Sequence, residues 1–157
     1  MKSIKWLVLA LLPFISAAAL ANNAMPENLV GKWKYDGSAG GFPETMALNN
    51  DASYEIQGLM TRLKVKTPEA CLVTIKGIMA VSQTAKDKVS ITSQSAIVTL
   101  NSPAPGTTLA QCNDMVSSLN QMPDLYIADV VMIDASTIQS QALGGDGNLV
   151  TFKRYFG

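Results

Sequence analysis

Few side chains in this sequence could do chemistry, and the lack of histidine narrows the choice further. The 157-residue chain contains no histidine. Ser-His-Asp and Cys-His catalytic systems need an imidazole, as do the usual zinc and non-haem iron sites. A Ser–Lys dyad or a carboxylate pair is compatible with the composition, but no spaced motif supports either. We therefore expect a protein that is not an enzyme, with no catalytic residues, no metal site and no cofactor.

The first 21 residues are typical of a secretory signal peptide. Lys2 and Lys5 form the positive start, residues 6–15 form an apolar stretch, and residues 19–21 (Ala-Leu-Ala) form a cleavage site. The apolar stretch is too short for a good membrane span, and no cysteine near the cleavage site could carry a lipid anchor. We expect cleavage near Ala21 and a soluble, periplasmic or secreted chain without a membrane anchor.

Two cysteines, Cys71 and Cys112, are the remaining reactive side chains. In an exported protein the default for such a pair is one disulfide, with two free thiols or a metal pair as alternatives. The disulfide is favoured because no histidine is present to complete a zinc site. Closing a loop of about 40 residues would stabilise the fold by about 4 kcal/mol in the chain-entropy model.

The expected mature chain, residues 22–157, is nearly neutral. Without Lys2 and Lys5 it has 10 Lys and Arg against 12 Asp and Glu, a net charge of −2. It has no basic stripe and no basic amphipathic segment, so we expect neither a nucleic-acid partner nor binding to a membrane surface. Its length suffices for one domain with a full core.

Alternation of apolar and polar residues dominates this domain and predicts β-strands. In the first strand, every second residue from Leu29 to Tyr35 falls on one face. Turn-forming residues at 49–52, 84–88 and 144–148 separate the strands. The expected strands span about 29–36, 46–48, 54–66, 71–81, 89–100, 125–133, 137–143 and 149–155.

Two features interrupt this alternation. In the strand over 89–100 the apolar residues change parity, which predicts a bulge or break near Ser93–Ser95. After it, the period changes to the three-and-four spacing of a helix over about 108–121, with Thr108 and Gln111 as a capping box. Cys112 falls on the apolar face of that helix, so the disulfide would pin the helix against the strand that begins at Cys71.

Eight strands in simple succession, with one helix inserted between the fifth and the sixth, favour an all-β architecture. The economical solution is an up-and-down antiparallel barrel over residues 22–157, because closure leaves no strand edge exposed. An open sandwich is the alternative.

A three-residue motif adds a family resemblance. Gly31 and Trp33 form a G-x-W in the first predicted strand, and Arg154 lies in the last. This combination resembles the lipocalin-like barrels of the calycin superfamily. The resemblance implies that Arg154 lies over Trp33 as a structural plug at one end of the barrel, where such a contact contributes about 0.5–2 kcal/mol. One departure is the helix, which lipocalins usually place after the last strand.

The resemblance places a ligand site in the barrel interior, at the end opposite the plug. There the loop 37–43 resembles the lid-like first loop of lipocalins, with Phe42 as an apolar contact. Arg62, Tyr35 or Tyr54 would orient a ligand head group. Arg62, Glu44 and Asp129 share the apolar faces of their strands, so each either lies at the barrel mouth or pairs inside.

Methionines supply the apolar lining expected of this site. Met60 and Met79 have inward parity, and a cavity lined partly by them would suit an adaptable apolar ligand. Thioethers can also hold Cu(I), but no tight Met-x-x-Met series occurs, so ordinary core packing is the favoured interpretation.

These features of the sequence lead to three hypotheses about function. The leading one is an exported small barrel that binds a small, mostly apolar ligand in its interior. The alternative is a protein-interaction module that inhibits a secreted protease, with a filled barrel and with residues 22–28 entering the protease cleft, as in small calycin-type inhibitors. The third is a structural role in which the pinned helix is a docking surface.

Overall fold

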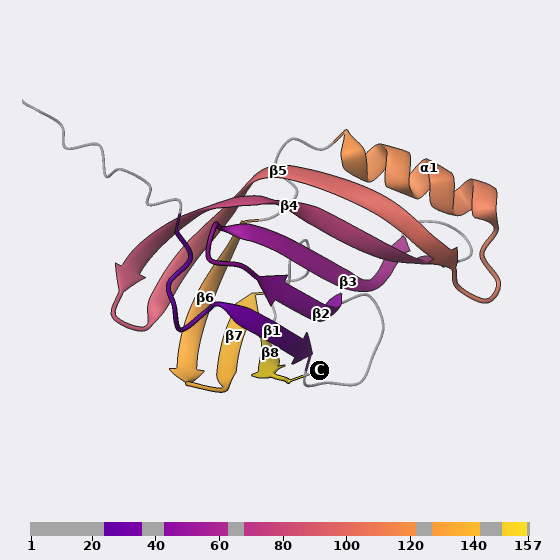
Figure 1. Ribbon diagram of the computed structural model, residues 1–157. Helices are drawn as coiled ribbons and strands as arrows, with labels where there is room; N and C mark the ends of the chain where they lie inside the picture. The colour runs from indigo at the N-terminus through magenta and orange to yellow at the C-terminus, as the bar shows by residue number, and fades with distance from the viewer. Residues whose placement is uncertain (1–23, 36–42, 63–67, 122–126, 142–148, 157) are drawn as a thin grey trace, which may run out of the picture.

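The protein folds into a closed barrel of eight antiparallel strands, in which each strand pairs with the next and the last pairs with the first (Figure 1). The computed structural model describes residues 24–35, 43–62, 68–121, 127–141 and 149–156. The predicted signal peptide, residues 1–21, lies outside them. The elements are β1 (Gly31–Tyr35), β2 (Pro43–Leu48), β3 (Ser53–Arg62), β4 (Glu69–Ala85), β5 (Lys88–Pro103), α1 (Leu109–Asn120), β6 (Ile127–Asp134), β7 (Thr137–Gln141) and β8 (Leu149–Arg154).

This architecture confirms the all-β, up-and-down barrel predicted from the sequence, with one helix between the fifth and sixth strands. The strand bounds differ in detail. The third strand was expected to run to about Lys66, but β3 ends at Arg62 and residues 63–67 lie outside the described part. The fourth and fifth strands reach closer to each other than expected, because the turn between Ala85 and Lys88 needs only two residues.

Helix α1 lies where the spacing of its apolar residues predicts it. Thr108 is its N-cap: the Thr108 hydroxyl accepts a bond from the Gln111 N–H (3.3 Å), and the Gln111 side chain accepts one from the Thr108 N–H (2.8 Å). This reciprocal capping box satisfies backbone donors that have no partner inside the helix. Cys112 and Met115 are the buried residues of its apolar face.

The helix takes the place of a strand beside β5. Only Lys88–Thr92 of β5 pairs with β6, while the rest of this long strand continues past the barrel toward α1 (Figure 1). At the end of the helix, the Asn120 side chain accepts a bond from the Val98 N–H (2.8 Å) and donates one to the Val98 carbonyl (3.0 Å). One amide side chain thereby makes the two bonds that a neighbouring strand residue would make.

The predicted irregularity near Ser93–Ser95 is a β-bulge. Ile78 lies opposite Ser95 and Met79 lies opposite Ser93, so Gln94 has no partner in β4. The extra residue reverses the parity of β5 and thereby keeps its apolar residues on the inner face at both ends. Gly77 permits this arrangement, because a Cβ there would collide with the Ser95 carbonyl oxygen.

The predicted contact between Arg154 and Trp33 is present where the last strand meets the first. The Arg154 guanidinium lies 4.4 Å from the centre of the Trp33 ring, and the two residues are direct partners across β1 and β8. Trp33 is fully buried, and its indole N–H donates to the Leu29 carbonyl (2.9 Å). The polar edge of the indole is therefore satisfied, and its face is covered by a cation.

Arg154 also connects β8 to two other segments of backbone. Its guanidinium donates to the carbonyls of Asn28 (2.8 Å), Val30 (2.7 Å) and Ala135 (3.0 Å). Gly31 leaves the space for it, because a Cβ there would lie 2.5 Å from Arg154 Nη1 and the backbone has a φ of +139°. Any residue with a side chain would therefore be strained at position 31.

We expect Arg154→Ala to lower the free energy of unfolding by about 2–4 kcal/mol, because it removes a cation–π contact and leaves carbonyls without a charged donor. Arg154→Lys should recover only part of this loss. A lysine ammonium lacks the planar guanidinium with which Arg154 reaches three carbonyls at once. Urea unfolding followed by Trp33 fluorescence measures both. Lys34→Ala, an exposed change on the same pair of strands, is the control, and an equal effect of Arg154→Ala and the control would contradict the role of the plug.

Candidate functional site

The end of the barrel opposite the plug holds most of the half-buried apolar side chains. The turns at 49–52, 86–87 and 135–136 lie at the plug end, so β1, β3, β5 and β7 all finish at the opposite, open end. Five half-buried side chains pack against the core there: Tyr35, Met60, Leu100, Val116 and Leu119. We call these five residues the mouth cluster.

The predicted ligand-binding residues divide between the mouth and the deep core. Tyr35 is half-buried and packs edge-on against Phe152, with 6.1 Å between ring centres, and Met60 is half-buried opposite Cys71. Tyr54 and Met79 are buried. Tyr54 lies about 20 Å from Met60 along β3, at about 3.3 Å per residue. These residues therefore do not form a single site, and Phe42 lies outside the described residues.

Tyr54 is a core residue with a polar tip. Its hydroxyl lies 3.0 Å from the Ser93 hydroxyl, inside the bulge of β5. Burial raises the pKa of the Tyr54 phenol above its ordinary value of 10.0, and the bond with Ser93 offsets part of that rise. Tyr54 thus packs against the bulge at the plug half of the barrel, away from the mouth.

Arg62 lies at the mouth, but its charge is already compensated. Its guanidinium is 3.0 Å from Asp114 of α1 and 3.5 Å from Glu69 of β4, and 30% of its side chain is exposed. Glu69 in turn accepts a bond from the Gln111 amide (2.9 Å). Among the described residues, the buried second oxygen of Glu69 has no hydrogen-bond partner, and it lies 3.5 Å from Arg62 Nη1.

The other two charged residues expected on apolar faces have different outcomes. Asp129 was expected inside or at the mouth, but its side chain is exposed on the outer face and pairs with Lys88 at 3.4 Å. Val130 is buried and marks the inner face of β6, whereas Ile133 is exposed. Because β6 is apolar on both faces, its alternation did not reveal which face is inward. The side chain of Glu44 lies outside the described residues.

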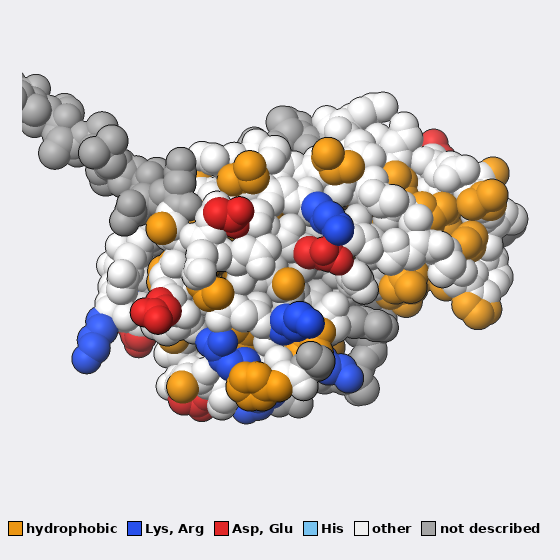
Figure 2. Space-filling view, viewed as in Figure 1, with side chains coloured by type: hydrophobic (Ala, Val, Ile, Leu, Met, Phe, Trp, Pro, Cys, Tyr) orange, Lys and Arg blue, Asp and Glu red, His pale blue; other side chains and the backbone are white. Residues whose placement is uncertain are grey.

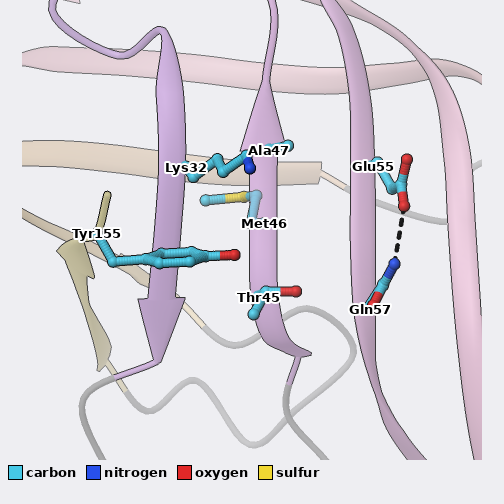
Figure 3. Close-up of a pocket in the computed structure, with 7 residues that line it drawn as sticks. All are labelled: Lys32, Thr45, Met46, Ala47, Glu55, Gln57 and Tyr155. Atoms are coloured by element: carbon cyan, nitrogen blue, oxygen red, sulfur yellow. Dashed lines mark hydrogen bonds between the residues drawn. The ribbon is translucent and has the colours of Figure 1, made fainter. Parts of the chain in front are cut away.

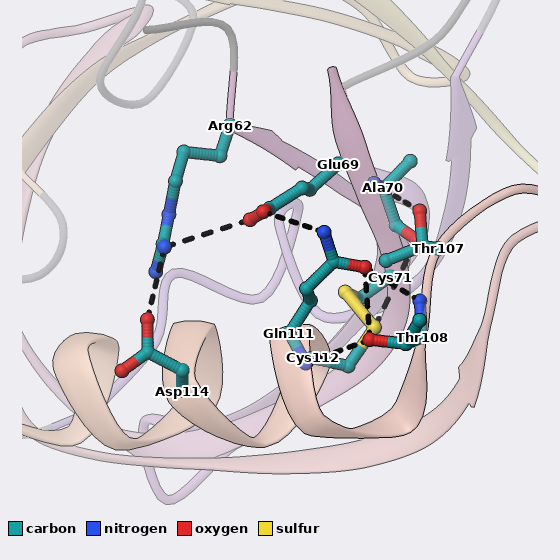
Figure 4. The surroundings of a disulfide bond; sticks show 9 residues. All are labelled: Arg62, Glu69, Ala70, Cys71, Thr107, Thr108, Gln111, Cys112 and Asp114. Atoms are coloured by element: carbon teal, nitrogen blue, oxygen red, sulfur yellow. Dashed lines mark hydrogen bonds and ion pairs between the residues drawn. A yellow bond between two sulfur atoms is a disulfide. The ribbon is translucent and has the colours of Figure 1, made fainter. Parts of the chain in front are cut away.

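The predicted disulfide between Cys71 and Cys112 is present, with both cysteines fully buried. Figure 4 shows how polar contacts surround it: Arg62, Glu69 and Gln111 form a chain on one side. On the other side the Thr107 hydroxyl accepts a bond from the Ala70 N–H (3.0 Å). The start of β4 is therefore attached covalently to α1, and hydrogen bonds join it to Gln111 of the helix and to Thr107 just before it.

The segment expected to enter a protease cleft, residues 22–28, is folded against the barrel where it is described. Met25 is only 5% exposed, and its N–H donates to the Asn50 carbonyl (3.2 Å). The Pro26 carbonyl accepts a bond from the Leu29 N–H (2.8 Å), which turns the chain into β1. Ala24 is exposed.

A hollow of about 300 Å³ lies on the outer face of the barrel, over β1, β2 and β3 (Figure 3). Its lining residues are Lys32, Thr45, Met46, Ala47, Glu55, Gln57 and Tyr155. Sequence reasoning missed it, because alternation assigns most of these residues only to a solvent-facing side. The residue pairs Lys32–Ala47 and Ala47–Glu55 in adjacent strands would have been the signal, once strand register was known.

Comparisons with models of protein families, with curated proteins and with solved structures found no match for this chain. The closed eight-stranded barrel is compatible with a lipocalin-like fold. Among the described residues, no helix has the length and apolar character needed to cross a membrane. Within the same ranges, no three acidic or cysteine side chains gather as a possible metal site.

We expect removal of the disulfide by Cys71→Ala with Cys112→Ala to lower the free energy of unfolding by about 4 kcal/mol, since the bond closes a 41-residue loop. The loss should be accompanied by faster hydrogen exchange in α1 than in β1, because the disulfide is the covalent link between the helix and β4. Arg62→Gln, which removes only the ion pairs, serves as the comparison. Unchanged exchange in α1 would contradict the anchoring role of the disulfide.

We expect Tyr54→Phe to cost about 1 kcal/mol at neutral pH, because it removes the bond to Ser93. The pKa of Tyr54 is raised in the folded state, so its contribution is present below pH 10 and is lost as the pH rises through the folded pKa. The variant should therefore lose less stability than the parent between about pH 8 and about pH 11. Urea titrations of both proteins at these pH values measure the change. An equal loss of unfolding free energy in the variant and the parent would show that Tyr54 does not cause this pH dependence.

Proposed function

We propose that this protein is an exported, non-enzymatic barrel that binds a small, mostly apolar molecule at its open end. The observation that carries the proposal is the mouth cluster, in which apolar side chains from β1, β3, β5 and α1 pack against the core but stay half-buried. Apolar surface at a barrel mouth is where small ligands bind in such folds. Burying it against a ligand removes it from water, at about 25 cal/mol per Å².

The division of the predicted residues refines this proposal. Tyr35, Met60 and the helix residues Val116 and Leu119 would contact the ligand, with Phe42 as a further candidate. Tyr54 and Met79 would act from beneath as part of the packed core. Because Arg62 already faces two carboxylates, a ligand head group that hydrogen-bonds to it without carrying a full negative charge is favoured.

Export is the compartment that the chain chemistry supports. A buried disulfide between Cys71 and Cys112 persists in oxidising surroundings such as a periplasm or the extracellular space. This agrees with the signal-peptide pattern of residues 1–21. We therefore propose a periplasmic or secreted carrier.

Inhibition of a secreted protease is the alternative proposal. The packed core around Trp33 and Tyr54 favours it, because an inhibitor needs a rigid body and no cavity. The burial of Met25 speaks against insertion of the whole 22–28 segment, since only residues 22–24 precede that anchor.

Titration of the folded protein with the neutral apolar fluorophore N-phenyl-1-naphthylamine tests the carrier proposal. We expect saturable binding that Met60→Glu and Leu119→Glu each weaken by about tenfold, since both place a charge against the apolar ligand. Ile97→Glu on the exposed outer face of β5 is the matched control and should bind as the parent does. No saturable binding, or equal weakening by the control, would contradict a site at the mouth.

An activity assay separates the alternative. Secreted metalloproteases would be assayed with and without the protein, and again after deletion of residues 22–24. Inhibition that the deletion abolishes, in a protein that does not bind the fluorophore, would establish the inhibitor function instead. No inhibition in either form would exclude insertion of the N-terminal segment.

A further inference from the structure

The hollow on the outer face of the barrel has a lysine among its lining residues. Lys32, which lines it, is exposed and has no ion pair within the ranges that the structure describes. Glu55, the one acidic residue among the described lining residues, is already paired with Lys76 at 3.0 Å and accepts a bond from Gln57 at 2.8 Å. The hydrogen bond from Lys76, and after it the bond from Gln57, holds the pKa of Glu55 below its ordinary value. The carboxylate therefore stays ionised beside Lys76.

Two further lysines lie beside the hollow. Lys34 is in register with Thr45, a lining residue, and lies directly opposite Lys153 of β8. Lys153 donates to the Thr137 hydroxyl (3.0 Å). Like charges directly opposite one another destabilise a pair of strands. Figure 2 shows Lys and Arg side chains gathered over β1, β2 and β8.

The walls of the hollow carry hydrogen-bonding groups and one aromatic ring. Tyr155 follows β8, and its N–H donates to the Lys32 carbonyl (3.0 Å), which places the two side chains next to each other. Figure 3 shows its ring extending across β1 toward β2, with Thr45 and Gln57 beyond it. The ring can stack on the C–H face of a sugar, while the Thr45 hydroxyl and the Gln57 amide can bond to hydroxyl groups.

We propose that this hollow binds a small hydroxylated carboxylate of the sugar-acid class. Its carboxylate pairs with Lys32, its ring lies on Tyr155, and its hydroxyls meet Thr45 and Gln57. The volume of about 300 Å³ is at the small end of ligand pockets and suits a molecule of this size. The site is separate from the mouth cluster, because its residues other than the core residue Met46 lie on the outer face of the barrel.

Amide chemical shifts of the folded, disulfide-bonded protein, titrated with sodium galacturonate at low salt, test the proposal. We expect saturable shifts at Lys32, Thr45 and Gln57. Methyl galactoside lacks the carboxylate and acetate lacks the ring. Each should bind at least tenfold more weakly than galacturonate, because a tenfold loss of affinity corresponds to about one charge-assisted hydrogen bond. Added sodium chloride should weaken galacturonate binding, since the ammonium is exposed.

Two variants and a control locate the site. Lys32→Gln should weaken galacturonate binding about tenfold. Tyr155→Leu should reduce the preference for galacturonate over acetate. Lys86→Gln, in the exposed turn between β4 and β5, removes an equal charge elsewhere and should change nothing. No saturable shifts, or equal weakening by Lys86→Gln, would overturn the proposal. Equal affinity for acetate and galacturonate would overturn the assignment to sugar acids.

Discussion

Closure of the barrel depends on the contact between Arg154 and Trp33. The first and last strands, β1 and β8, are far apart in the sequence but pair with each other to close the barrel. Trp33 and Arg154 lie directly opposite one another in this pair of strands. The guanidinium also gathers carbonyls from the segment before β1 and from the turn after β6. Gly31 is part of the same arrangement, because it leaves the space that the arginine needs.

The second constraint is the length of the β4–β5 hairpin. Both strands exceed their neighbours, and β6 covers only the first few residues of β5. The remaining length requires another partner, which α1 supplies through Asn120 and through the disulfide to Cys71. The inserted helix is thus a consequence of strand length, and it brings Val116 and Leu119 to the open end of the barrel.

Local signals in the sequence were sufficient for much of the fold. Strand alternation, the phase change at Ser93–Ser95 and the capping box at Thr108 each express a short-range rule, and each is observed. The plug was predictable because Gly31, Trp33 and Arg154 are a recognisable set. The orientation of β6 was not predictable: with apolar residues on both faces, only its register with β5 and β7 shows that Asp129 faces outward.

The candidate sites were harder to predict than the fold, for a physical reason. Parity places Tyr54 and Met60 on the same face of β3 but does not show that one is in the core and the other at the mouth. Parity likewise cannot reveal that the Arg62 charge is taken up by Asp114, 52 residues later in the chain. The outer hollow depends on neighbours in β1, β2 and β3 and on Tyr155 beyond β8, a combination that appears only once the strands are in register.

The substitution of Asn120 for a strand residue has a consequence for assembly. Until α1 docks, the far half of β5 presents unpaired backbone groups to any other extended chain, which is the usual route to strand exchange and aggregation. The Cys71–Cys112 bond holds the helix in the position that blocks this route. The disulfide therefore limits how far the free edge of β5 can become exposed once the helix has docked.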